Sequence, residues 1–138
     1  MKRKGSFASQ SILSYSEVET MSCSPLLEKS LDFSTRIVLF YEYFSKVRKD
    51  TTLAKQLLRS STSIGANINE AIYGVSRADF ISKLHISLKE TGESIYWLML
   101  FKRTNLIDYD FDSLISLAEE LKRMLISSIK TAREHSDG

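Results

Sequence analysis

Apolar residues recur at three- and four-residue steps from position 24 to about position 49, a pattern typical of an amphipathic helix. Ser24 can cap the first turn, and Pro25 suits the first helical position because no partner is needed for its missing N–H there. One stripe on this helix is predicted to be buried, and it consists of Leu26, Phe33, Ile37, Phe40, Tyr41 and Phe44.

A second apolar stripe follows a short polar break at residues 49–52, and it is formed by Leu53, Leu57, Ile64, Ile68 and Ile72. Small residues lie beside this stripe, namely Ser60, Ser61, Gly65 and Ala71. They predict that a neighbouring helix approaches closely. We expect Gly74 to end the helix in the left-handed conformation, which glycine adopts without strain.

The third helix is predicted to begin at Ser76, because Asp79 three residues later completes a capping box. Its inner stripe is formed by Phe80, Leu84, Leu88, Thr91, Ile95 and Leu98. We expect this helix to end near Arg103 or Thr104.

A turn over residues 105–110 leads to the fourth stripe, which is formed by Leu114, Leu117, Leu121, Leu125, Ser128 and Ile129. Helices joined by such short turns are antiparallel neighbours. The sequence therefore predicts an all-α, up-down-up-down four-helix bundle over residues 24–134. Residues 1–23 are rich in serine and lack apolar periodicity, which predicts a flexible N-terminal tail.

Composition adds few functional indications. The chain has 138 residues, enough for one domain, and its 19 Lys and Arg against 17 Asp and Glu give a net charge of +2. This balance is too even to predict strong non-specific attraction to nucleic acid or anionic lipid. The single cysteine, Cys23, cannot form an internal disulfide, which favours a cytoplasmic location. No segment approaches the roughly 20 apolar residues of a membrane span, so we expect no membrane partner.

Residues for catalysis or metal binding are scarce. The two histidines, His85 and His135, are not preceded by a glutamate three residues earlier, as di-iron bundles require. Paired cysteine or histidine ligands and a Gly-x-Ser-x-Gly motif are also absent from the sequence. We therefore expect no enzymatic activity, no metal, no cofactor and no small-molecule substrate.

Polar residues on the second helix form one candidate cluster. Asn67 lies beside the apolar stripe, Ser63 precedes it by one turn, and Glu70 follows further round the helix. Because a buried amide needs hydrogen-bond partners, structural bonding within the bundle is favoured over a ligand site.

Basic residues form a second candidate cluster. Lys46, Arg48 and Lys49 lie at the end of the first helix, while Lys55 and Arg59 share an exposed face of the next. A solvated surface is the simplest interpretation. RNA or DNA binding is the alternative, because association of several copies would merge weak basic patches into a stronger field.

The third helix carries apolar residues on two opposite faces. At 100° per residue, the side opposite Leu84 carries Ile86, Trp97 and Leu100. A monomeric bundle buries one stripe per helix, so a second copy of the chain is the simplest cover for the other stripe. Packing of Trp97 under the tail or a loop is the alternative.

Two carboxylates, Glu90 and Glu93, lie close to this outer strip. We expect them to find cationic or hydrogen-bonding partners across the interface and to set its register, because an unpaired buried charge is costly. The predicted oligomer interface thus comprises Ile86, Glu90, Glu93, Trp97 and Leu100.

The second helix also carries a Ser-Ile-x-Ala-Asn-Ile-x-Glu pattern, formed by Ser63, Ile64, Ala66, Asn67, Ile68 and Glu70. This pattern resembles the four-helix-bundle family first described from intervening sequences within bacterial 23S ribosomal RNA genes. Gly65 stands where that family often has proline, and Ala71 where it has glycine. The third helix is similar to the family through Ser76, Asp79, Phe80, Leu84, Ile86 and Glu93, and the resemblance covers about residues 26–130.

The resemblance implies a ring-like homopentamer. A similar bundle is the accessory subunit of diversity-generating retroelements, where it contacts a reverse transcriptase and RNA. We therefore expect a non-catalytic, homo-oligomeric scaffold or accessory protein with a protein partner. An RNA- or DNA-binding module is the alternative function.

Overall fold

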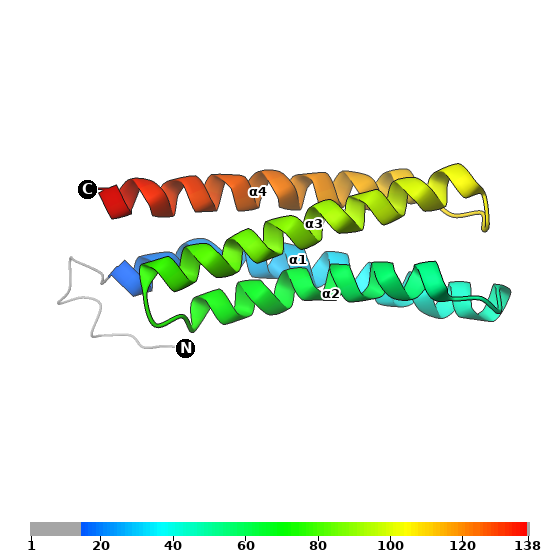
Figure 1. Ribbon diagram of the computed structural model, residues 1–138, viewed down its shortest axis with the longest axis horizontal. Coiled ribbons are helices and arrows are strands. Elements are labelled where there is room, and N and C mark those ends of the chain that lie inside the picture. The colour runs from blue at the N-terminus through cyan, green and yellow to red at the C-terminus, as the bar shows by residue number, and fades with distance from the viewer. Residues whose placement is uncertain (1–14, 138) are drawn as a thin grey trace.

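Four helices form the fold of residues 15–137, the part of the chain that the computed structural model describes, with side chains from 25 to 135 (Figure 1). These helices are α1 (Tyr15–Val47), α2 (Thr52–Ile72), α3 (Arg77–Thr104) and α4 (Phe111–Asp137). Neighbours in sequence pack against each other and α4 also packs on α1, whereas neither diagonal pair, α1 with α3 or α2 with α4, is in contact. The predicted antiparallel four-helix bundle is confirmed.

The predicted start of the first helix is wrong. α1 begins at Tyr15 and Pro25 lies inside it, so the Ser24-Pro25 pair does not mark a helix start. Proline removes one backbone donor and crowds the preceding turn, but it does not prevent the residues before it from being helical. Residues 15–23 of the predicted tail are therefore helical, and its remainder, residues 1–14, lies outside the described residues. At the other end of the chain, α4 extends just beyond the predicted boundary at residue 134.

The predicted stripes supply the core. Every helix contributes fully buried apolar side chains, including Phe33 and Ile37 from α1, Ile64 from α2, Leu84 from α3 and Leu114 from α4. Other predicted stripe members lie at the edges of the core and are half-buried, namely Tyr41, Leu53, Ile72, Leu88 and Leu117.

Aromatic rings close the core at the end where α3 turns into α4. The ring centroid of Phe40 lies 5.4 Å from that of Phe101, 5.5 Å from that of Phe111 and 4.8 Å from that of Tyr109. All three pairs are edge-to-face, the arrangement in which the positive ring edge meets a negative ring face. The α3–α4 connection is thereby fixed to α1.

Small residues allow close helix packing, as the sequence predicted. A side-chain carbon on Gly65 would lie 2.8 Å from the hydroxyl of Ser30, so α1 approaches α2 at a point where only glycine fits without a shift. Between α2 and α3, the hydroxyls of Ser60 and Ser94 lie 2.8 Å apart, and Ser87 donates to the carbonyl of Ile64 at 2.8 Å. These buried hydroxyls are therefore satisfied within the bundle.

The α2–α3 turn confirms one sequence prediction and corrects another. The Ser76 hydroxyl accepts a hydrogen bond from the Asp79 amide at 3.0 Å, which is the expected N-cap. Gly74, however, does not adopt a positive φ, so the predicted left-handed stop is wrong. A side-chain carbon there would lie 2.9 Å from a carboxylate oxygen of Asp79 and 3.1 Å from the carbonyl of Ala71. Crowding in the tight turn accounts for this glycine.

Candidate functional site

The outer strip of α3 is exposed and apolar. Ile86 is 38% exposed, while Trp97 and Leu100 are half-buried, and Trp97 packs against the edge of the core. Tyr96 and Met99, which the sequence analysis did not assign to this surface, are 59% and 48% exposed. The second apolar face of α3 is therefore present, and part of Trp97 is covered by its own chain.

The two carboxylates of the strip find their partners within the same chain. Arg59 of α2 lies against both, with Nη1 at 3.3 Å from an oxygen of Glu90 and Nη2 bonded to Glu93. Trp97 Nε1 also donates to Glu93, at 3.0 Å. The expectation that these carboxylates need partners across an interface is therefore corrected, because the guanidinium fork of one arginine satisfies both.

This cluster shifts the pKa values of Glu93 and Arg59. The hydrogen bond from Trp97 and then that from Arg59 lower the pKa of Glu93 below its ordinary value, since both stabilise the carboxylate. The hydrogen bond to Glu93 raises the pKa of Arg59. The charge of Arg59 is thus largely compensated, and this residue contributes little to a surface for anions.

The motif residues of α2 have structural partners. Asn67 is half-buried and donates through Nδ2 to the carbonyl of Ser63 at 2.9 Å, one turn earlier in the same helix. Glu70 is exposed and accepts from Lys83 Nζ of α3 at 2.9 Å, which raises the pKa of Lys83. Asn67 and Glu70 therefore serve separate contacts, one within α2 and one between α2 and α3.

The remaining predicted basic residues gather at one end of the bundle. Lys46, Arg48, Lys49 and Lys55 are all exposed around the α1–α2 turn. Asp50 lies among them, and hydrogen bonds from Thr52 lower its pKa. Since α3 ends and α4 begins at the same end of an antiparallel bundle, this surface also carries the acidic α3–α4 connection.

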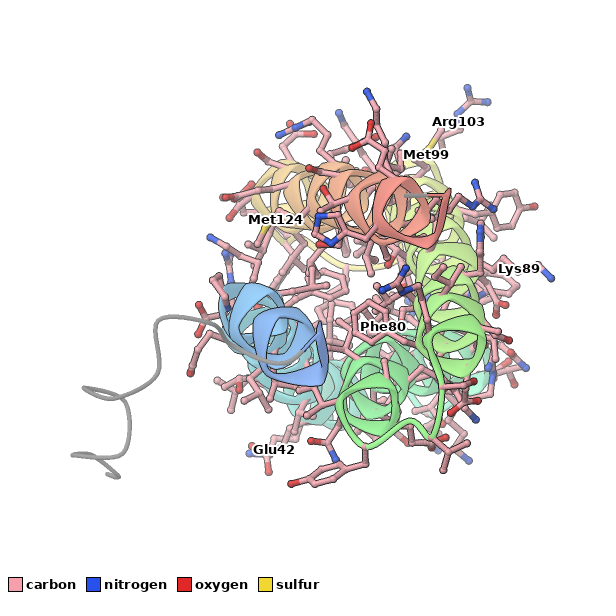
Figure 2. The ribbon with its side chains drawn as sticks, turned by 90° about the vertical axis from the view of Figure 1, so that its left-hand side faces the viewer. Glu42, Phe80, Lys89, Met99, Arg103 and Met124 are labelled. Carbon is pink, nitrogen blue, oxygen red and sulfur yellow. The ribbon has the colours of Figure 1, made fainter. Side chains whose placement is uncertain are left out.

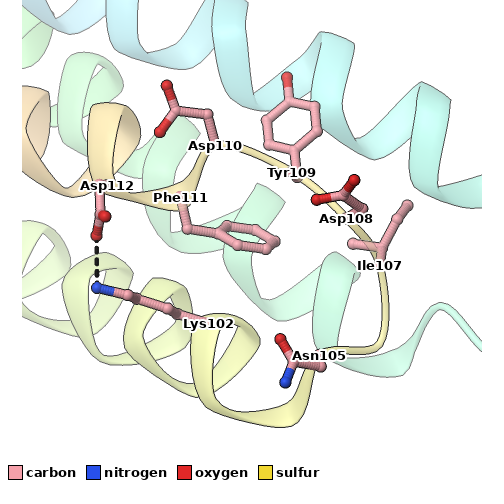
Figure 3. Close-up of a pocket in the computed structure, with 8 residues that line it drawn as sticks. All are labelled: Lys102, Asn105, Ile107, Asp108, Tyr109, Asp110, Phe111 and Asp112. Carbon is pink, nitrogen blue, oxygen red and sulfur yellow. Dashed lines mark hydrogen bonds and ion pairs between the residues drawn. The ribbon is translucent and has the colours of Figure 1, made fainter.

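An acidic depression of about 270 Å³ follows that connection (Figure 3). Asp108, Asp110 and Asp112 line it, and Lys102 reaches Asp112 with its Nζ 2.6 Å from the carboxylate. Within the described range, no group of three or more His, Cys, Asp or Glu side chains has the geometry to hold a metal ion. We assign no ligand to this depression.

A second depression, also of about 270 Å³, lies between α3 and α4. Leu88, Ile126 and Ile129 make it mainly apolar, and Lys130, Glu134 and the pair His85 and Arg133 surround them. Arg133 Nη2 lies 2.7 Å from His85 Nε2; because arginine is only a donor, the imidazole nitrogen accepts. This groove combines an apolar floor with a rim on which Lys130 and Arg133 outnumber Glu134.

The outer face of α1 was not identified from the sequence. Leu31, Val38 and Leu39 are 52%, 47% and 57% exposed, on the side of α1 away from the core. The same 100° geometry that revealed the outer strip of α3 would have found them.

For the helices described, none has both the length and the apolar character needed to cross a membrane.

The chain is similar to a known protein family and to a solved structure. A family model described as 23S rRNA-intervening sequence protein matches residues 25–127. A crystal structure of a protein with unknown function from the S23 ribosomal protein family of Bacteroides thetaiotaomicron is 45% identical, with a TM-score of 0.75, and the match covers 79% of this chain and 98% of that chain. Among curated proteins, none matches this chain.

Proposed function

The chain belongs to the 23S rRNA-intervening sequence protein family, and we propose that it is a non-catalytic, homo-oligomeric scaffold or accessory subunit. The assembly has five copies in this proposal, the number that the family resemblance implies. It works in the cytoplasm, in keeping with the single cysteine, and presents a partner protein with surfaces repeated in each copy.

The observation that carries this proposal is the exposure of apolar side chains on helices that already have a filled inner face. Tyr96 and Met99 are exposed on α3, and Leu39 is exposed on α1, while the bundle core beneath them is complete. Exposed apolar side chains that share one face support an interaction site there. A second copy is always available to cover it.

The polar groups support a structural role. The buried serines and the Arg59 cluster have hydrogen-bond or ion-pair partners within the bundle, and these contacts join α2 to α3. His85, which lines the groove between α3 and α4, accepts from Arg133 through Nε2, so this nitrogen is already engaged in a hydrogen bond.

The test is the mass of the full-length chain in solution, measured by light scattering after size exclusion. We expect a mass several times the chain mass of 15.8 kDa, and a smaller species for Tyr96→Glu. Asn69→Glu on the exposed side of α2 is the matched control and should leave the mass unchanged. A mass of 15.8 kDa for the parent at micromolar concentration would overturn the proposal.

Nucleic-acid binding is the second candidate function, and one observation favours it. Lys46, Arg48, Lys49 and Lys55 form an exposed group, and no ion pair engages them within the described part of the chain. In an oligomer with aligned bundles, this basic group would be repeated on one rim, and the positive electrostatic potential there would be stronger.

Filter retention of labelled RNA at several salt concentrations tests this second function. Lys46→Ala, Arg48→Ala and Lys49→Ala combined should weaken retention and flatten its dependence on salt, because phosphate contacts release counterions. Replacing Lys29, which already pairs with Glu120, is the control for lost charge. Equal retention by the triple variant and the parent would exclude this surface.

A further inference from the structure

We propose that the copies associate through two different faces, with α1 of one chain seated on α3 and α4 of the next. This proposal rests on the proposed oligomer and adds the identity of the contacting surfaces. The α1 face consists of Glu28, Leu31, Asp32, Val38, Leu39 and Glu42. The α3–α4 face consists of Lys89, Gly92, Tyr96, Met99, Arg123, Ile126 and Lys130.

The α1 face combines apolar and acidic side chains. Leu31, Val38 and Leu39 are about half exposed, as expected for a helix face that lacks a neighbour in its own bundle. Two cations of the same segment point elsewhere, since Lys29 pairs with Glu120 of α4 at 3.2 Å and Arg36 bonds to Ser113 of α4 at 2.6 Å.

The acidic members of the α1 face, in contrast, lie free in solvent. Glu28, Asp32 and Glu42 are exposed, and no ion pair engages them among the residues that the structure describes. Glu42 points away from the bundle in Figure 2. The exposed side of α1 is therefore apolar and negative.

The α3–α4 face is apolar and positive. Met99 and Ile126 are 48% and 49% exposed, and the apolar floor of the α3–α4 groove continues this surface. Lys89, Arg123 and Lys130 are exposed, and Lys89 points away from the bundle in Figure 2. Two acidic groups between α3 and α4 are already paired with lysines, Glu119 with Lys122 at 3.2 Å and Asp112 with Lys102 at 2.6 Å, and Glu134 lies on the groove rim.

Gly92 provides an independent indication that a helix docks here. It lies on the side of α3 that carries Leu88 one turn before and Met99 two turns after. Glycine inside an exposed helix is less favourable than alanine, and a side-chain carbon at this position would meet nothing within 4 Å. The single chain thus gains nothing from this glycine, whereas a neighbouring helix could approach closely over it.

Charge complementarity identifies the occupant as a second copy. The apolar and negative α1 face matches the apolar and positive α3–α4 face, and opposite potentials favour association while like faces repel. In the bundle, α1 and α3 are diagonal and do not touch, so the two faces point in different directions. One contact therefore leaves one face of each kind free for the next copy, so subunits add head to tail and form a ring when the rotation between them closes.

The test mixes two variants that each lack one face. Leu31→Lys with Leu39→Lys removes the α1 face, and Met99→Lys with Ile126→Lys removes the α3–α4 face. All four positions are about half exposed, so both full-length variants should fold, which circular dichroism and urea unfolding verify. Ala66→Lys with Asn69→Lys on the exposed side of α2 is the control with equal added charge.

Each face variant alone should have the mass of a single chain, 15.8 kDa, because each lacks one half of every contact. Their equimolar mixture should form a heterodimer of twice that mass, since one intact pair of faces is restored. The control should keep the parent mass.

Three results would overturn the pairing. If the parent is an oligomer and both variants keep its mass, the copies associate through other faces. The pairing is then wrong, while the proposed oligomer stands. A mixture that remains monomeric would show that the two faces do not bind each other. If RNA rather than protein covers the α3–α4 face, Met99→Lys with Ile126→Lys would leave the oligomer intact. A monomeric parent, by contrast, would remove the proposed function itself.

Discussion

Two glycines lie inside helices of this bundle, and their surroundings differ completely. At Gly65 of α2, a side-chain carbon would lie 2.8 Å from the Ser30 hydroxyl of α1. At Gly92 of α3, a side-chain carbon would meet no atom within 4 Å. The first glycine is explained by the fold of one chain, whereas the second is not.

The difference is the reason why we propose an interface on the outer side of α3. A helix accepts the cost of an interior glycine where another backbone must come close. Inside the bundle, the neighbour of Gly65 is the side chain of Ser30 on α1. On the outer side, no atom of the same chain takes this place at Gly92, and our proposal puts a second copy there.

The largest effect should separate the inner and outer faces of α3. Leu84 is fully buried, and Leu84→Ala should lower the free energy of unfolding by about 2–5 kcal/mol, because it leaves a cavity in the core. Ser82 is exposed, so Ser82→Ala should be nearly neutral. Urea unfolding of both variants measures this, and equal midpoints would refute the assignment of the two faces.

A somewhat smaller effect is expected at Gly65, where α1 leaves no room for a side chain. Gly65→Leu should destabilise the bundle by about 1–3 kcal/mol, because the side chain has to displace the buried Ser30 and separate α1 from α2. Thermal and urea unfolding report the loss. Wild-type stability in this variant would mean that α1 and α2 are less closely packed than described.

Substitution of Gly92, which has open space beside it, should change the stability in the opposite direction. Gly92→Ala should raise the stability of the subunit by about 1 kcal/mol, since helix propensity improves and no contact is strained. Urea unfolding at the lowest workable protein concentration reports on the subunit alone. Gly65→Ala is the matched control and should show no such gain, and a loss of stability in Gly92→Ala would place a neighbour of the same chain at this site.

The smallest effect concerns the Arg59 cluster. Because the pKa of Glu93 is lowered in the folded chain, its contribution is fully present above its ordinary value of 4.5 and is lost as the pH falls through the folded pKa. The side chain is 36% exposed, so Glu93→Gln should cost only about 0.2–1 kcal/mol at pH 7. Unfolding at pH 7 and pH 3 should show that the difference between variant and parent becomes smaller in acid, and a difference of equal size at pH 3 would contradict this.

Helical periodicity predicted the four helices and the inner stripes well. The positions of Phe33, Ile64 and Leu84 follow from spacing alone, because a period of 3.6 residues determines which side chains share a face. The start of α1 was missed, since proline is compatible both with a helix start and, at a cost, with a helix interior.

The candidate surfaces were predicted less completely. The outer strip of α3 follows from periodicity, but the pairing of Arg59 with Glu90 and Glu93 depends on how α2 lies beside α3, which spacing within one helix does not reveal. The open space at Gly92 likewise becomes visible only when neighbouring helices are placed around it.

Sedimentation velocity of Gly92→Gln beside the parent protein tests the central claim most directly. Glutamine is a good helix former and fits the open space at this position, so the subunit should fold at least as well as the parent. We expect the parent to sediment as an assembly and Gly92→Gln to sediment mainly as a single chain of 15.8 kDa, because the added side chain blocks the neighbouring helix. An assembly of the same size in both proteins would show that the surface around Gly92 is uncovered, and would contradict the claim.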